Sequence, residues 1–129
     1  MNSVFLASDH PLLPSPALDA VLGQLGAAKH EANLVVLESA GSRLYFRRFF
    51  DVSDFGDDEL AAIHAVVGSS PHIVEVEYSD LELLKRVLRA LVDAVLPLAF
   101  DNDHGSIMDA DSLREKLVND QPWDWRISP

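Results

Sequence analysis

Residues 71–100, PHIVEVEYSDLELLKRVLRALVDAVLPLAF, decide the fold. In the first eight of these residues, charged side chains alternate with β-branched and aromatic ones, which is typical of a strand with one buried face. Ser79 and Glu82 then have the spacing of a capping box and predict the start of a helix. Pro97 ends that helix, because it lacks the amide hydrogen that a helix interior uses. The helix is amphipathic, since apolar residues recur at three- and four-residue spacing: Leu81, Leu84, Val87, Leu88, Leu91, Val92 and Val95.

Patterns on the N-terminal side of this stretch predict more of the same sheet. A first strand is expected over residues 3–7. Ser15 is a good N-cap and Pro16 suits the first position of a short helix. Two apolar segments, residues 32–38 and 43–50, flank a short loop that contains a glycine. This arrangement predicts a β-hairpin.

Patterns on the C-terminal side complete the predicted fold. An acidic segment, residues 51–59, precedes a helix over residues 60–67, so its charges lie where the helix dipole favours them. Residues 100–108 predict a second hairpin, with Asn-Asp-His-Gly as its turn, and residues 109–120 predict a last helix. We therefore predict a single α+β domain over residues 1–129. Its sheet is expected to be mixed, largely antiparallel and five- or six-stranded, with the helices packed against it.

The composition restricts the classes of function. The chain has 129 residues, no cysteine, and 21 acidic against 10 basic residues, for a net charge of −11. A disulfide framework, a thiol nucleophile and a cysteine-bound metal are therefore excluded. No secretion signal and no apolar run of about 20 residues is present, so we expect a cytoplasmic protein without a membrane span. The charge repels nucleic acid and anionic lipid and favours a basic partner, although acidity also serves solubility alone.

Catalytic signatures are absent from the sequence. It contains no Gly-x-Ser-x-Gly elbow and no glycine-rich phosphate loop, and its five histidines occur singly. Asp101, Asp103 and His104 are the nearest approach to a metal or catalytic cluster, but they lack the spacing of a calcium loop. A hairpin turn is the favoured interpretation of these residues, and a small metal-dependent hydrolase is the alternative. We expect no enzyme activity and no cofactor.

Two other features have more than one interpretation. Arg43, Arg47 and Arg48 alternate with aromatic residues, as on a platform for single-stranded nucleic acid. In so acidic a chain we expect these arginines to pair with residues 51–59 or to line a partner surface instead. The tail contains Trp123 and Trp125, either as interface anchors or, as we favour, docked against the core of the domain.

Three acidic blocks are the main candidate binding surface: residues 51–59, residues 75–82 and residues 101–111. Each block alone is usually a solvated face, but two that converge would present carboxylates to an arginine- and lysine-rich partner. From these blocks we select as candidate partner contacts Asp54, Asp57, Asp58, Glu75, Glu77, Asp101 and Asp103.

The C-terminal part carries a resemblance to a known class of proteins. Residues 98–117, LAFDNDHGSIMDADSLREKL, followed by PWDW at residues 122–125, resemble the strand, turn, helix and tryptophan ending of bacterial immunity proteins, including those of contact-dependent growth inhibition systems. The resemblance implies tight binding of a cognate toxin domain, often a basic nuclease, so that its active site is blocked. An acidic adaptor or regulatory subunit would have the same bulk properties.

Overall fold

Strand β5 (His72–Tyr78) and helix α3 (Leu81–Ala94) form where the sequence predicts them. On β5, Val74, Val76 and Tyr78 point into the main core and are almost fully buried. Pro97 follows the end of α3, as expected of a residue that cannot continue a helix. The buried stripe of the helix is made of Leu83, Leu84, Val87, Leu88, Leu91 and Val92.

The N-cap of α3 is Asp80, so the predicted capping box of Ser79 and Glu82 is wrong by one residue. Asp80 Oδ1 accepts a hydrogen bond from the Leu83 amide at 3.2 Å, and its Oδ2 accepts one from the Ser42 hydroxyl at 2.7 Å. A carboxylate has acceptors for both donors at once. The cap therefore also fastens the start of α3 to the sheet.

The computed structural model describes residues 2–13, 15–49, 51–103 and 105–119, so Trp123 and Trp125 lie outside the described residues. Both predicted hairpins and the predicted C-terminal helix are present. The strands are β1 (Asn2–Ser8), β2 (Ala27–Glu31), β3 (Leu34–Ser39), β4 (Ser42–Phe49), β5, β6 (Ala99–Asp101) and β7 (Ile107–Asp109). The helices are α1 (Pro16–Leu25), a 3-10 turn η1 (Val52–Asp54), α2 (Asp57–Val67), α3 and α4 (Ala110–Asn119).

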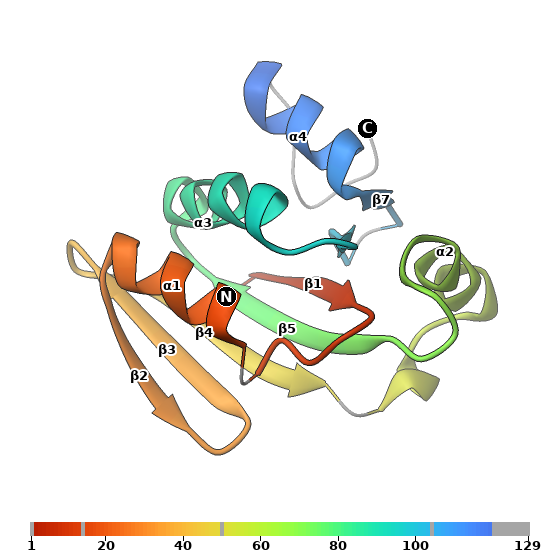
Figure 1. The fold of residues 1–129 in the computed structure, drawn as a ribbon, viewed down its shortest axis with the longest axis horizontal. Coiled ribbons are helices and arrows are strands. Elements are labelled where there is room, and N and C mark those ends of the chain that lie inside the picture. Colours follow the sequence, from red (N-terminus) through yellow and green to blue (C-terminus); the bar gives the residue numbers. More distant parts are fainter. Residues whose placement is uncertain (1, 14, 50, 104, 120–129) are drawn as a thin grey trace.

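All strands belong to one sheet, in the order β2-β3-β4-β5-β1-β6-β7 (Figure 1). The predicted α+β class is confirmed. In the described residues the sheet has seven strands, where five or six were expected. Each neighbouring pair of strands is antiparallel, so the sheet is antiparallel and not mixed. The pairing of β1 with both β5 and β6 places the first strand of the chain inside the sheet.

Strand β2 is the strand that the sequence does not predict. Its residues, AAKHE, show no apolar alternation, and it forms through pairing with β3, in which Ala28 lies opposite Leu37. Gly26 precedes it, and a Cβ atom there would lie 2.1 Å from the carbonyl oxygen of Glu38. The missing side chain therefore lets the chain turn from α1 directly into the sheet.

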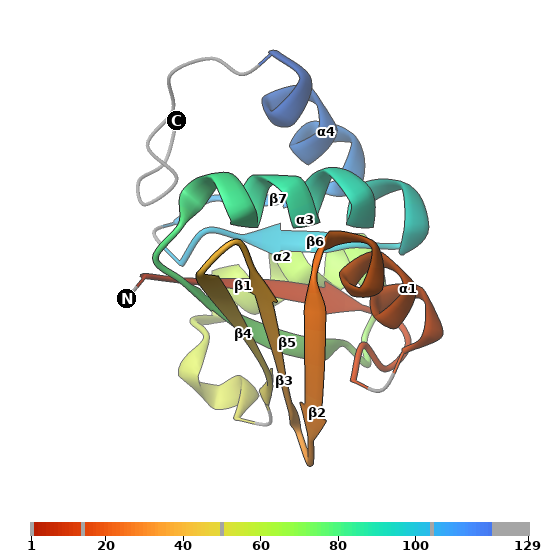
Figure 2. The same cartoon turned by 90° about the vertical axis from the view of Figure 1, so that its left-hand side faces the viewer.

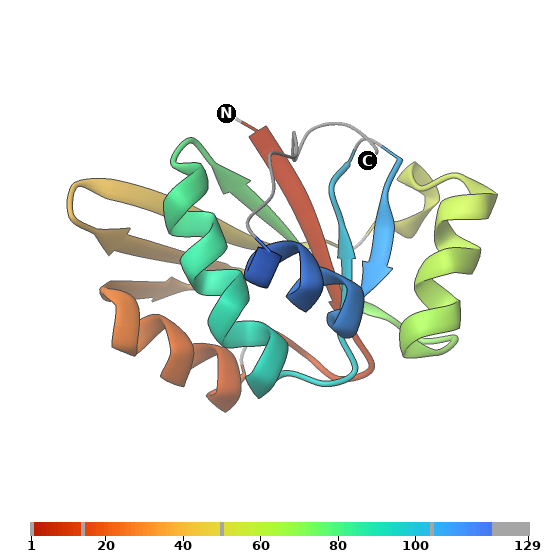
Figure 3. The ribbon, with the colours of Figure 1, turned by 90° about the horizontal axis from the view of Figure 1, so that it is seen from above.

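Helices α1, α3 and α4 lie on one face of the sheet, with α1 and α4 on either side of α3 (Figures 2 and 3). Their apolar residues form the main core with the facing side chains of the sheet, including Val4, Leu37 and Phe46. The opposite face is covered by α2 only over part of its width. There, Ile63 and Val67 of α2 form a second, smaller core with residues of β1, β5 and β6.

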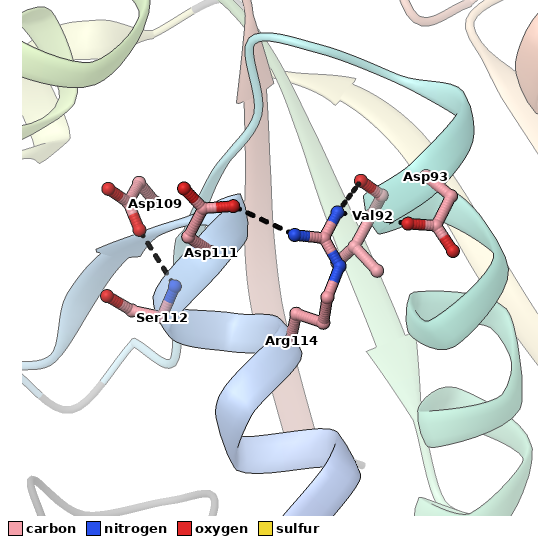
Figure 4. A network of polar contacts seen from close by, with 6 residues as sticks. All are labelled: Val92, Asp93, Asp109, Asp111, Ser112 and Arg114. Carbon is pink, nitrogen blue, oxygen red and sulfur yellow. Dashed lines mark hydrogen bonds and ion pairs between the residues drawn. The ribbon is translucent and has the colours of Figure 1, made fainter.

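Helix α4 is fastened to α3 by Arg114 (Figure 4). Its Nη2 donates to the carbonyl oxygen of Val92 and to Asp93 Oδ1, both at 3.0 Å, and its Nη1 donates to Asp111 Oδ1 at 2.8 Å. Asp93 first, and then Asp111, hold the pKa of Arg114 above its usual value. The guanidinium group thus satisfies a carbonyl near the C-terminal end of α3, where a positive charge is favourable.

The cap of α3 leads to a stability prediction with a matched control. Asp80→Ala is expected to lower the free energy of unfolding by about 1 kcal/mol, the usual cost of losing an N-cap side chain. Ser79→Ala, one residue away, is expected to change it by less than about 0.5 kcal/mol. Denaturant unfolding of both variants at neutral pH measures the difference. A larger loss for Ser79→Ala would contradict the assignment of the cap.

The same cap predicts a dependence on pH. Hydrogen bonds from the Ser42 hydroxyl and then the Leu83 amide hold the pKa of Asp80 below its ordinary value of 3.8. Because this pKa is depressed in the folded state, the cap stabilises fully above 3.8, and its contribution is lost as the pH falls through the folded-state pKa. The stability difference between wild type and Asp80→Ala should therefore shrink below that pH. A difference that stays constant in this range would show that the charge of Asp80 is not involved.

Candidate partner-binding surface

Residues 51–59, the acidic segment that runs from the end of β4 into the first turn of α2, carry five acidic residues, and the hydrogen bonds of the described residues use two of them as local caps. Asp51 Oδ1 accepts from the Ser53 amide at 3.3 Å, and Glu59 Oε1 accepts from the Gly56 amide at 3.2 Å. These two carboxylates close the turns of the segment. The other three acidic residues, Asp54, Asp57 and Asp58, are exposed.

Asp54, Asp57 and Asp58 make no ion pair within the part of the chain that the structure describes. Asp57 and Asp58 begin the first turn of α2, where the helix dipole stabilises negative charge. Val52, in the preceding turn, is 40% exposed and places an apolar side chain beside these acids. The segment thus offers carboxylates and an apolar contact to a partner.

Phe55 anchors this segment to the sheet. Its ring lies 5.1 Å from that of Phe5 on β1 and 5.5 Å from that of Phe49 on β4, measured between ring centroids. Phe5 in turn lies opposite Glu75 in the pairing of β1 with β5. The candidate contact Glu75, which is half-buried, therefore lies on the sheet face that carries the acidic segment.

Glu77 lies on the same face but is already paired. It forms an ion pair with Arg47 of β4, and Arg47 also lies 5.7 Å from the centroid of the Tyr45 ring. Arg43 forms a second pair, at 2.7 Å from Glu38, and hydrogen bonding to Tyr45 together with that carboxylate raises its pKa. The expected pairing of these two arginines with residues 51–59 is therefore wrong, because the β-sheet places other carboxylates within closer reach.

The turn between β6 and β7 uses its polar side chains to hold itself together. Asp101 is only 2% exposed and its Oδ1 accepts from the Asp103 amide at 2.8 Å. Asn102 is fully buried, and its side-chain oxygen accepts from the Ser106 amide at 3.0 Å. Asp103 is exposed, with a φ of 64°. The predicted hairpin turn is confirmed, and Asp101 is corrected from a surface contact to a buried turn residue.

The hydrolase alternative receives no support from this turn. His104, the third residue of that hypothesis, lies outside the described residues. Among the residues that the structure describes, no group of three or more histidine, aspartate or glutamate side chains is arranged to hold a metal ion. The position of Asp101 is explained by the geometry of the turn.

Two of the acidic blocks converge at one end of the sheet. Figures 2 and 3 both place the start of β1, the η1 turn with the beginning of α2, and the connection between β6 and β7 at this end. We call its exposed carboxylates the acidic end: Asp54, Asp57, Asp58 and Asp103. Glu75 and Glu77 of the remaining block lie on the adjoining sheet face.

Two hollows of the described structure are lined by residues other than the carboxylates of the acidic end. A groove of about 350 Å³ runs between α2 and the start of α4, lined by Val66, Leu96 and Ala110 among others. A smaller cleft of about 160 Å³ lies between Leu12, Phe49 and His72. Exposed carboxylates outside these hollows are the kind of surface that a macromolecular partner contacts.

The class that these observations define is a single α+β domain built on an antiparallel seven-stranded sheet with an acidic end. No protein-family model matches the chain, and neither the curated proteins nor the solved structures contain a match to it. None of the helices in the described ranges has the length and apolar character that a bilayer span requires.

Two features of this surface escape sequence reasoning. The sequence contains Arg47 and Glu77, but only the folded sheet shows their ion pair, which is diagonal because the register of β4 with β5 places Arg47 opposite Glu75. Val52 is missed because a single valine between acidic residues carries no pattern. The use of Asp51 and Glu59 as local caps is, by contrast, visible in their spacing to Ser53 and Gly56.

Proposed function

We propose that this protein is an immunity protein that binds a cognate toxin domain through its acidic end and blocks the active site of that domain. The observation that carries the proposal is the group Asp54, Asp57 and Asp58, three exposed carboxylates without ion pairs in the described structure. Carboxylates that are not neutralised within their own chain are the ones that can pair with a partner's arginines and lysines.

The distribution of charge supports a basic partner. Residues 27–49 hold four basic side chains, Lys29, Arg43, Arg47 and Arg48, against two acidic ones. The net charge of −11 is therefore concentrated on the remainder of the chain, to which the whole acidic end belongs. Such an asymmetric field orients an approaching basic protein and raises the rate of association.

A nuclease domain is the partner class that this chemistry fits best. Its substrate site must be basic to bind phosphates, and carboxylates held on a rigid helix start can occupy the same positions. The rings of Phe5, Phe49 and Phe55 fix the segment, so little conformational entropy is lost on binding. Inhibition then follows from steric occlusion together with charge complementarity.

The decisive experiment combines capture with toxicity. The tagged chain is used to capture partners from lysate of its source organism, and each specific partner is expressed alone and together with the chain. We expect one basic domain that arrests growth when expressed alone and is harmless in the presence of the chain. If the specific partner proves harmless alone, the protein is an adaptor or regulatory subunit and the proposal is wrong.

The acidic end is tested with charge reversals against the captured domain. Asp57→Lys with Asp58→Lys is expected to lower the association rate by about 10- to 100-fold at low salt. Asp9→Lys with Glu115→Lys makes the same change of charge after the end of β1 and on α4, away from the acidic end, and serves as the control. Stopped-flow kinetics and a thermal unfolding curve for each variant separate binding from folding. Equal losses in the two variants would exclude the acidic end as the interface.

A further inference from the structure

The β2 edge of the sheet is open in the described structure. Strand β2 pairs with β3 on one side, and the order of the sheet ends there. Four of its residues, Ala27, Lys29, His30 and Glu31, are exposed. Figures 1 and 2 show the hairpin of β2 and β3 extending past α1, away from the other helices. The outer side of β2 is therefore accessible to another strand.

The hairpin geometry shows which backbone groups face outward. A two-residue loop closes on the pair Glu31 and Leu34, and residues of an antiparallel ladder alternate between hydrogen-bonded and non-bonded pairs. Ala27, Lys29 and Glu31 therefore direct their N–H and C=O groups to β3. Those of Ala28 and His30 point away from the sheet, where they can pair with an added strand.

The opposite edge of the sheet is different. Strand β7 has only three residues, leads directly into α4 and is flanked by α2 (Figure 3). Short edge strands and helical cover are common ways of blocking edge-to-edge association. Strand β2 has five residues and no proline, and α1 contacts it on the sheet face that carries Ala28 and His30. The two edges are therefore not equivalent as pairing sites.

The charges of β2 are complementary to those of a second copy of β2. When two copies pair antiparallel about a two-fold axis at His30, each Lys29 lies opposite Glu31 of the other copy. If the two-fold axis lay at Lys29 instead, the Lys29 side chains of the two copies would lie opposite one another and repel. The His30 ring is held by Asp19 of α1, with 2.9 Å between Nε2 and Oδ1, so it lies toward α1. Lys29 and Glu31 lie on the other face of the strand.

We infer that this protein forms a symmetric homodimer through antiparallel pairing of its β2 strands, which joins two seven-stranded sheets into one. We assign a second copy of the chain to this edge because a two-fold axis at His30 places each Lys29 opposite a Glu31, so that the strand is complementary to itself. Residues 27–49 also carry more basic than acidic side chains, so two strongly acidic chains repel one another least at this edge. The acidic end lies elsewhere on the sheet and stays accessible in such a dimer.

The experiment is a charge exchange measured by analytical ultracentrifugation of the full chain at low salt over a concentration series. The wild type is expected to show a concentration-dependent dimer. Lys29→Glu and Glu31→Lys should each weaken the dimer at least about tenfold, because each turns two attractive cross-strand pairs into repulsive ones. An equimolar mixture of these two variants restores both pairs and should form the heterodimer. The double variant that exchanges the two residues should again form a homodimer.

A backbone variant tests the pairing without a change of charge. Ala28→Pro removes an outward N–H group that β3 does not use and that lies opposite Ala32 of the second copy, so it should weaken the dimer while circular dichroism stays that of the wild type. Should this variant fail to fold, the charge exchange still decides the matter. A wild type that stays monomeric over the whole series would overturn the inference, as would charge variants that dimerise like the wild type. A monomer that takes up a strand of its toxin partner at β2 would likewise exclude the homodimer.

Discussion

Leu88→Ala is expected to lower the free energy of unfolding by about 3 kcal/mol, within the usual range for a fully buried leucine. Leu88 has no exposed surface and lies on α3 in the middle of the main core. Its replacement removes apolar contacts with the sheet and leaves a cavity that the neighbouring side chains fill only in part. Helix α3 has the most amphipathic pattern in the sequence, so this residue tests whether the predicted organising helix holds the fold together.

The matched control for this prediction is Leu96→Ala. Leu96 lies in the connection after α3 and is 60% exposed, so its truncation should change stability by less than about 0.5 kcal/mol. Guanidinium or urea unfolding of both variants, followed by circular dichroism, gives the comparison. Similar losses of stability in the two variants would contradict the packing of α3 against the sheet.

The regular part of the fold could be predicted because its periodicities are strong. The alternation in β5 and the heptad-like spacing in α3 each place apolar residues on one face of the element. In the folded protein these faces are buried against one another, so the pattern in the sequence predicts the element. The N-cap shows the limit of such reasoning. Ser79 and Asp80 are both good caps in isolation, and the choice between them depends on Ser42, which is close to Asp80 only in the folded chain.

Strand β2 could not be predicted because nothing in its own residues favours a strand. Lys29 and Glu31 carry charges and the two alanines have low β propensity, so pairing with β3 and contact of Ala28 with the core decide its structure. The signals that were available are Gly26 and Asn33, since asparagine tolerates the positive φ that a tight turn requires. A glycine followed by five residues and a tight turn is compatible with an edge strand.

The candidate site was predicted in part. The exposed acids of the acidic segment follow from composition, because neighbouring carboxylates without a base cannot all be buried. Asp101 could not be separated from them by sequence, since a buried turn aspartate and an exposed one look alike until the turn is formed. Glu77 was likewise indistinguishable from Glu75, since Arg47 lies opposite Glu75 in the sheet register, whereas its ion pair in the described structure is with Glu77.

Phe5→Ala is expected to lower the free energy of unfolding by about 3 kcal/mol and also to loosen the acidic segment. Phe5 is 7% exposed, and its ring meets those of Phe49 and Phe55 edge to face at 5.1 Å between centroids. These rings connect the segment with the sheet. Hydrogen exchange should therefore show lower protection in η1 and the first turn of α2 than in α3. Leu22→Ala, a fully buried change on α1, should destabilise the protein without that local effect.

A double-mutant cycle of Phe5 and Phe55 measures the aromatic contact itself. Phe5→Ala and Phe55→Ala remove the same contact, so their combined cost should be smaller than the sum of the single costs by about 0.5–1.5 kcal/mol. Simple additivity would show that Phe55 does not hold the segment against β1. With coupling present, Phe55→Ala should also slow the association with the captured toxin domain, because Asp57 and Asp58 are then no longer held in one position. Rigid presentation of these carboxylates is what distinguishes a specific inhibitor surface from a merely acidic one.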